Sequence, residues 1–420
     1  MKALVALGLL ALLALAPPLP ARLAGEELWS ESGFFVDLPE GFRLKEGDGK
    51  SRFSFEDPAG GLEFDILAYD SGRFAGAEAF ANDSLVRIGS NGERETFVYE
   101  RRNAVFAELS FSLGGARKRG YAIFIEAARP PAAPAAQAAP PRPATPDFTA
   151  PPGSAPSGAT GATGAAAAEK HVALLAFCDE ARFEAYADFI LSSLDCFSAD
   201  RAARRSPGPL SQYLLPWPAA REETRKVVFG GESFVLPFST EEAEQCAGVA
   251  GREFRVLEAY GETEDLWKAA WARCYRMIYR ESARRLDRLA LELDRRLPDD
   301  PTEAARRLLA WVQDWKYERD LEGIDFVDPF SAAHESRGDC DSRAMVMAIV
   351  LERRGVDAIL MLSRDYSHAM AGVDVPGGGQ RFSFGGKDWL VAETTAKVGI
   401  GMIAAAQSDW KKWLGVSFGD

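Results

Sequence analysis

Three residue types that together can break an amide bond follow one another in the C-terminal part of the chain. Cys340 comes directly after Gly338 and Asp339, and an apolar run over 344–351 follows after three further residues. At the first turn of a helix, unpaired backbone N–H groups and the helix dipole stabilise a thiolate. His368 and Glu393 follow. The order predicts nucleophilic catalysis by a Cys-His-Glu triad with Cys340, His368 and Glu393 as the catalytic residues.

The elements around these residues must bring them together. Residues 340–354 have the apolar spacing of a helix that ends at a glycine. Residues 368–375 and 389–395 have the pattern of strands, and an antiparallel pairing would place His368 opposite Glu393. The carboxylate would then fix the tautomer of the ring and favour the imidazolium, whose charge stabilises a thiolate.

Each of the three residues also has an ordinary structural interpretation. A cysteine at a helix start is often a small buried apolar residue. His368 fits an ordinary strand histidine, and Asp374 and Asp388 compete with Glu393 for the third position. The intact order of all three residues favours the catalytic interpretation.

Other residues close in sequence to Cys340 have weaker claims to chemistry. Asp339 and Asp341 are expected to cap the helix rather than react. His334 fits either a donor to an oxyanion or a loop histidine. Trp311 and Trp315 lie one helical turn apart, and that spacing favours a place in the core over a substrate platform.

Residues 255–405 resemble the transglutaminase-like superfamily of cysteine acyl-transfer enzymes and peptidases. The signature is Gly-Asp-Cys before a helix, a histidine opening a later strand, and an acid followed by threonine, as at 338–340, His368 and 393–395. Glu-Thr-Thr in place of Asp-Pro-Thr is most similar to little-characterised bacterial and archaeal members. The resemblance implies a papain- or transglutaminase-like α+β domain, with a helical block and an antiparallel sheet, that acts on amides of a protein or peptide without a cofactor.

Composition limits the partners. The 420 residues are enough for two domains, and the net charge of −13 offers no basic surface for a nucleic acid. The three scattered histidines and distant cysteines lack the spacing of metal ligands, so no metal site is predicted.

The first residues have the pattern of a secretory signal: a lysine at position 2 and an apolar run over 3–16. We predict a signal peptide over 1–24 and export to the periplasm or the cell exterior, with no other membrane span. The residues two places before Ala21 and Ala24 are not small, which leaves cleavage and retention as an anchor both open. A component of the cell envelope is one expected partner.

Export would permit disulfides among the five cysteines. Cys178 and Cys196 flank an expected helix over 179–194, which would hold them about 24 Å apart and prevent a bond. Cys246 and Cys274 are left either to pair or to remain buried thiols.

The N-terminal half has the pattern of an α+β domain. Short alternating runs broken by turns predict antiparallel strands, and residues 74–88 predict an amphipathic helix. The expected strands cover 34–38, 52–55, 62–69, 96–99, 103–113 and 121–126.

A segment rich in proline and alanine over 129–168 is predicted to be disordered. A strand at 171–177 and the helix over 179–194 follow it, and a lone strand needs a sheet to join. We therefore predict that the segment is an insertion between two neighbouring antiparallel strands, 121–126 and 171–177. The strand, the helix and the closing residues 192–197 resemble the last unit of PsbP-like domains.

The domain prediction follows from these patterns. The N-terminal domain is expected over 25–198, a proline-rich linker over 199–220 and the transglutaminase-like domain over 221–420. The second domain should open with a hairpin of 227–229 and 234–238 around two glycines. Its expected helices cover 240–247, 264–297 and 301–315.

Overall fold

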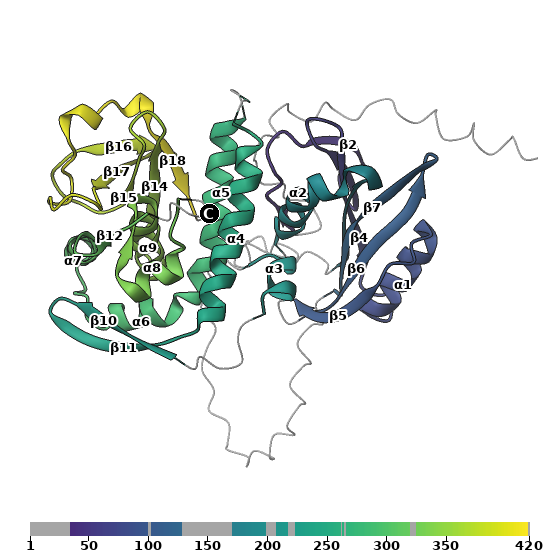
Figure 1. Cartoon of the computed structure of the whole chain (residues 1–420), viewed down its shortest axis with the longest axis horizontal. Helices are drawn as coiled ribbons and strands as arrows, with labels where there is room; N and C mark the ends of the chain where they lie inside the picture. The colour runs from purple at the N-terminus through teal and green to yellow at the C-terminus, as the bar shows by residue number, and fades with distance from the viewer. Residues whose placement is uncertain are drawn as a thin grey trace, which may run out of the picture.

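The computed structural model describes residues 34–99, 102–127, 170–198, 207–216, 223–261, 263, 266–319 and 325–418. Within these ranges the chain forms an α+β structure with two main antiparallel sheets. Figure 1 shows the two sheets at opposite ends of the molecule, with helices α4 (Thr240–Glu258) and α5 (Trp267–Arg285) standing between them. The predicted α+β fold class is confirmed. The predicted signal peptide and the segment 129–168 lie outside the described residues.

The N-terminal sheet has seven strands in the order β2-β3-β4-β8-β7-β6-β5, all antiparallel to their neighbours. A two-residue pair, β1 (Phe35–Val36) with β9 (Phe197–Ser198), lies apart from it. The seven strands are β2 (Arg43–Gly47), β3 (Arg52–Glu56), β4 (Leu62–Asp70), β5 (Arg94–Tyr99), β6 (Arg102–Leu113), β7 (Ala116–Ile125) and β8 (Lys170–Asp179).

The predicted pairing of the strands on either side of the proline-rich segment is confirmed. β7 and β8 are antiparallel neighbours, with Ile125 opposite Val172. β8 also pairs along its length with β4. The strand that follows the segment is thus an inner strand of the sheet, and the expectation of an insertion agrees with this topology.

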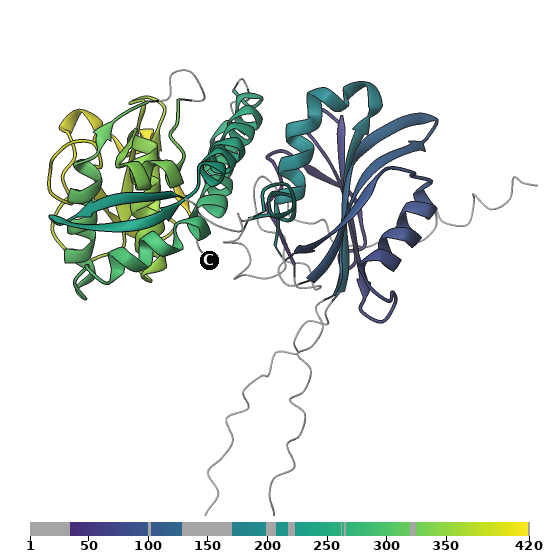
Figure 2. The ribbon, with the colours of Figure 1, turned by 60° about the horizontal axis from the view of Figure 1, so that its bottom comes forward.

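Both faces of the N-terminal sheet are buried, each under one helix. Alternate residues of a strand point to opposite faces, so Ile123 packs with the cluster under α2 (Phe183–Asp195) while Phe124 packs with the cluster under α1 (Ala77–Ile88). Figure 2 shows the two helices on opposite sides of the sheet. The expected helix 179–194 begins with a 3₁₀ turn at Glu180–Arg182.

Part of the predicted linker is helical. Helix α3 (Pro209–Leu214) begins at a proline and packs against the N-terminal domain. The Ser211 N–H and hydroxyl donate to the two carboxylate oxygens of Asp195 at 2.8 and 2.6 Å. The stretch 207–216 is therefore held to the first domain by buried hydrogen bonds, a role that its prolines do not indicate.

The helical block differs in its boundaries from the sequence prediction. The hairpin β10 (Glu223–Phe229) and β11 (Glu232–Phe238) turns at Gly230 and Gly231 as expected. Helix α4 continues through two glycines because its buried face packs on α5, where tertiary packing outweighs propensity. The single helix expected over 264–297 is wrong: Leu286, with ψ near 2°, separates α5 from α6 (Asp287–Asp294).

The C-terminal sheet has five strands in the order β16-β17-β15-β14-β18. Helix α9 (Cys340–Arg353) packs on β14 and β15, and α7 (Pro301–Gln313) packs on α9. The predicted antiparallel pairing of 368–375 with 389–395 is confirmed, with Ala371 opposite Ala392. The strands are β14 (Ala358–Ser363), β15 (His368–Val373), β16 (Arg381–Phe384), β17 (Lys387–Ala392) and β18 (Leu414–Ser417).

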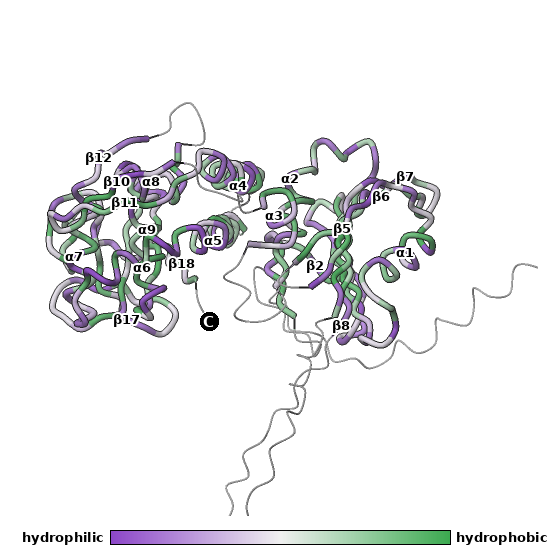
Figure 3. The backbone as a smooth tube through the Cα atoms, turned by 90° about the horizontal axis from the view of Figure 1, so that it is seen from below, coloured by the Kyte–Doolittle hydropathy of each residue, from purple (hydrophilic) through white to green (hydrophobic). Residues whose placement is uncertain are grey.

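Five elements of this part were not expected. β16 lies inside the glycine-rich connection between the two site strands, and β18 closes the far edge of the sheet. Helix α8 (Pro329–Glu335) precedes the cysteine. A short parallel pair, β12 (Lys316–Tyr317) with β13 (Arg337–Gly338), connects α7 to the cysteine loop, and β12 is hydrophilic in Figure 3.

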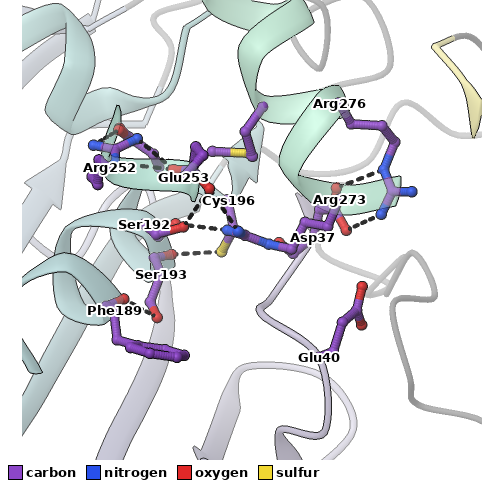
Figure 4. Close-up of polar contacts among 12 residues, drawn as sticks. Asp37, Glu40, Phe189, Ser192, Ser193, Cys196, Arg252, Glu253, Arg273 and Arg276 are labelled. Atoms are coloured by element: carbon purple, nitrogen blue, oxygen red, sulfur yellow. Dashed lines mark hydrogen bonds and ion pairs between the residues drawn. The ribbon is translucent and has the colours of Figure 1, made fainter. Parts of the chain in front are cut away.

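Buried arginines of α5 join the two halves. The Arg273 guanidinium donates to the carbonyls of Asp37 and Ser192 and to the Glu253 carboxylate, each at 3.0 Å (Figure 4). Two turns later, Arg280 donates to the carbonyl of Asp195 at 2.9 Å. A buried charge is tolerated when its hydrogen bonds are filled. Backbone carbonyls of the N-terminal domain therefore replace hydrogen bonds that these arginines would make to water.

A carboxyl group without a hydrogen-bond partner lies at the same junction. Arg276 forms a two-bond ion pair with Asp37 at 3.0 and 3.1 Å, whereas both carboxyl oxygens of the fully buried Glu40 lack a partner. Figure 4 shows Glu40 apart from the bonded groups. Burial and the nearby Asp37 raise the pKa of Glu40 to about 7, although Arg276 and Arg273 oppose the rise.

The structure shows the state of the cysteines and the character of the helices, which the sequence left open. All five cysteines are free, so the pair Cys246 and Cys274 does not form a disulfide and both thiols are buried. Among the residues that the structure describes, no helix combines the length and apolarity that a membrane crossing requires.

Candidate active site

The candidate nucleophile occupies the first position of α9. The Asp339 carboxylate caps the helix by accepting from the Ser342 N–H at 2.8 Å, as predicted. Gly338 has φ +150°, and a Cβ there would lie 2.9 Å from the Ser342 Cβ. The Gly-Asp-Cys order therefore has a local cause: the loop needs glycine to approach the helix, and the helix needs the aspartate to begin.

The histidine and the glutamate meet across the paired strands. His368 opens β15, Glu393 directly follows β17, and the His368 Nε2 lies 2.7 Å from the Glu393 Oε2. Both side chains are largely buried, with 12% and 6% of their surface exposed. Sequence reasoning predicted this contact, and it leaves the Nδ1 side of the ring for other chemistry.

Glu393 is held in its ionised form. Its Oε1 accepts from the Thr395 N–H at 2.8 Å and from the Thr395 hydroxyl at 2.6 Å. Burial would raise the pKa of Glu393, but the hydrogen bond and charge of His368 and the bonds from Thr395 lower it below its usual value. The carboxylate can therefore accept from the Nε2–H of His368 and fix the ring tautomer.

The cysteine thiol lies beside the strand that begins with His368. The Ala369 N–H donates toward the sulfur and lowers the pKa of Cys340, but burial and the carboxylates of Asp341 and Asp339 raise it well above the usual range. The hydrogen bonds of the described residues do not join the Cys340 thiol directly to the His368 ring. These surroundings disfavour the thiolate, contrary to the expectation from its position at the helix start.

Asp341 does not cap the helix, and that part of the prediction is wrong. Its Oδ2 accepts from the hydroxyl of Tyr275, a buried residue of α5, and its Oδ1 lies 3.5 Å from the Cys340 Sγ. Asp339 already fills the cap, which leaves the next carboxylate free to turn into the protein. The sequence carries no signal for this contact because Tyr275 is 66 residues away.

Two buried polar residues that sequence reasoning missed hold the loops of the site. Arg343 donates to the carbonyls of Gly338 at 3.1 Å and Trp315 at 2.7 Å. Gln313 donates to the backbone carbonyl of Glu393 at 2.8 Å. An arginine directly before the apolar run 344–351 was the one available signal for such a role.

The remaining residues considered from sequence lie as follows. His334 is on α8, not in a loop: its Nδ1 donates to the Phe330 carbonyl at 2.8 Å. Trp311 and Trp315 are buried with ring centroids 4.8 Å apart, as expected for core residues. Asp374 is exposed and pairs with Lys387 at 2.9 Å. Asp388, the other rival of Glu393, is also exposed.

Comparisons with known proteins give distant structural similarities. No family model matches the chain, and no curated protein matches it. The chain is similar to the solution structure of cyanobacterial PsbP (CyanoP) from Synechocystis sp. PCC 6803, with 11% identity over 44% of this chain and 97% of that chain and a TM-score of 0.26. A crystal structure from Bacteroides thetaiotaomicron VPI-5482 matches with 10% identity over 61% and 78% of the two chains and a TM-score of 0.24. These similarities assign no family, and the transglutaminase-like resemblance stays a prediction.

Proposed function

We propose that the protein is an exported, transglutaminase-like cysteine enzyme that transfers acyl groups from amide bonds, as a peptidase, an amidase or a transferase. The observation that supports this most directly is the 2.7 Å contact between His368 Nε2 and Glu393 Oε2. The residue after His368 on the same strand, Ala369, donates its N–H toward the Cys340 sulfur. A cysteine at a helix start, a histidine and an orienting carboxylate have the roles that thiol acyl transfer needs.

The proposed reaction assigns one role to each residue. His368 takes the proton of the Cys340 thiol on Nδ1, and the thiolate attacks the amide carbonyl carbon. The tetrahedral intermediate then collapses as the C–N bond breaks, and His368 returns the proton to the leaving amine. Water or a second amine resolves the thioester, and Glu393 stabilises the imidazolium throughout.

The test compares the wild-type protein with Cys340→Ala on envelope extracts. Three products are measured: new N-termini by mass spectrometry, released ammonia, and incorporation of a fluorescent primary amine. Cys274→Ala, which removes a buried thiol, is the matched control. We expect at least one product to disappear in Cys340→Ala and to persist in the control. Products that are equal in all three proteins would refute the proposal.

A second candidate function is a binding or scaffold protein of the cell envelope that keeps the fold without chemistry. The observation that favours it is the pKa of Cys340, which burial and two carboxylates raise well above the usual range. Iodoacetamide labelling separates the two functions. A catalytic thiol that forms a thioester with its substrate should be protected from labelling when envelope extract is present, whereas a scaffold thiol should be labelled at the same rate with and without the extract.

A further inference from the structure

Asp341 occupies a position between the candidate nucleophile and a helix that belongs to the domain junction. Tyr275 donates its hydroxyl proton to one carboxylate oxygen of Asp341, and the other oxygen lies 3.5 Å from the Cys340 sulfur. Tyr275 is 1% exposed and packs edge-on against Phe326. A buried tyrosine whose ring is fixed on several sides holds its acceptor in one place.

The contact between Cys340 and Asp341 affects the two charge states of the sulfur differently. A thiol can donate to a carboxylate, whereas a thiolate next to a carboxylate is repelled. The contact therefore favours the protonated form of Cys340. Several groups of the surrounding elements interact electrostatically or by hydrogen bonds with Cys340 or Asp341: Asp339, Tyr275, His368, Asp325 and the Ala369 N–H. The charge of Cys340 also affects the pKa values of Tyr317, Arg319 and Arg343.

We propose that Asp341, positioned by Tyr275, holds Cys340 as an uncharged thiol in the resting protein. This proposal rests on the proposed function and adds a latent state to it. Formation of the thiolate requires the sulfur to leave Asp341 and to pass its proton to His368 Nδ1. The proton then sits on the imidazole, the negative charge sits on the sulfur, and Asp341 keeps its own charge.

The decisive variant is Asp341→Asn, which keeps the size of the side chain and an oxygen that can accept from Tyr275. The rate of Cys340 alkylation by iodoacetamide is followed between pH 6 and 10 by mass spectrometry of the Cys340 peptide. Removal of the neighbouring charge should move the midpoint of the profile to lower pH and raise the rate at pH 7 by about tenfold. A midpoint and a rate equal to those of the wild type would overturn the proposal.

A second variant keeps the test decisive if Asp341→Asn does not fold. Tyr275→Phe retains the packed ring and removes the hydroxyl, so Asp341 loses its orientation and the alkylation midpoint should again fall. Tyr260→Phe is the matched control, because that buried hydroxyl donates to the Glu40 carbonyl at 2.7 Å and lies outside the site. A purely structural role of Tyr275 predicts reduced thermal stability with an unchanged midpoint.

These measurements separate the two proposals. Alkylation reports the charge of the thiol and needs no substrate or turnover. If Cys340→Ala removes no product but Asp341→Asn still shifts the midpoint, the proposed function fails and the role of Asp341 stands. The opposite pair of results, a lost product and an unshifted midpoint, removes Asp341 from the mechanism.

Discussion

Glu40→Gln should make the protein more stable at neutral and alkaline pH. Glu40 is fully buried at the domain junction, and neither carboxyl oxygen has a partner. Its pKa rises from 4.5 to about 7 because burial and Asp37 disfavour the charged form. The folded protein therefore binds this proton more tightly than the unfolded chain does. Glutamine has nearly the same shape and never carries the charge.

The size and sign of the effect follow from linkage. Well below pH 4.5 both states are protonated, and Glu40 costs nothing through ionisation. Between pH 4.5 and 7 the unfolded chain ionises first, so the folded state loses stability as the pH rises, and above pH 7 the loss stays constant. A shift of about 2.5 units corresponds to about 3 kcal/mol at alkaline pH. Between pH 5.5 and 8.5 the loss grows by about 2 kcal/mol.

Urea unfolding of wild type and Glu40→Gln at pH 5.5 and 8.5 measures this difference. The buried amide has a cost of its own, but it does not titrate, so it cancels when the two pH values are compared. We expect the advantage of Glu40→Gln over wild type to grow by about 2 kcal/mol from pH 5.5 to 8.5. Glu46→Gln, which removes an exposed carboxylate, should show no such growth. An advantage independent of pH would show that Glu40 is already ionised or solvated in the folded protein.

Two further predictions concern the third site residue and the N-terminal sheet. Glu393→Gln should leave the circular dichroism spectrum unchanged and strongly reduce any Cys340-dependent activity, because the ion pair that orients His368 is weakened. Full turnover in Glu393→Gln, together with loss of activity in Asp374→Asn or Asp388→Asn, would show that the third catalytic residue is not Glu393. Proteolytic cleavage within 129–168 should leave both fragments in one peak on size exclusion, because β8 is hydrogen-bonded between β4 and β7. Separate elution of the fragments would contradict the insertion.

Local patterns predicted the parts of the structure whose causes are local. Patterns of apolar residues located six of the seven strands of the first sheet, and Gly230 with Gly231 located a hairpin. The edge strand β2 was not predicted, because its residues are mostly exposed and do not alternate. The pairing of β15 with β17 followed from two adjacent strand patterns, and with it the contact of His368 with Glu393. Local sequence patterns were therefore sufficient to predict the residues of the candidate triad and the contact between His368 and Glu393.

Long-range contacts explain what could not be predicted. Helix α5 reads as amphipathic, but the sequence does not reveal that Arg273 is buried, because its acceptors include the Asp37 carbonyl 236 residues away. The break at Leu286 contains neither glycine nor proline. Asp341 was assigned as a cap because its distant partner, Tyr275, was unknown.

Because of helix α5, neither half of this chain can easily be exchanged for a foreign domain. Three arginines of this helix, Arg273, Arg276 and Arg280, donate to groups of the N-terminal domain, while Tyr275 of the same helix contacts the carboxylate beside Cys340. A chimera with a foreign N-terminal domain would remove acceptors that these guanidinium groups use, among them the backbone carbonyls bonded to the buried Arg273 and Arg280. Evolutionary change at the junction is thus constrained jointly with change at the cysteine, and we expect substitutions in one half to require compensation in the other.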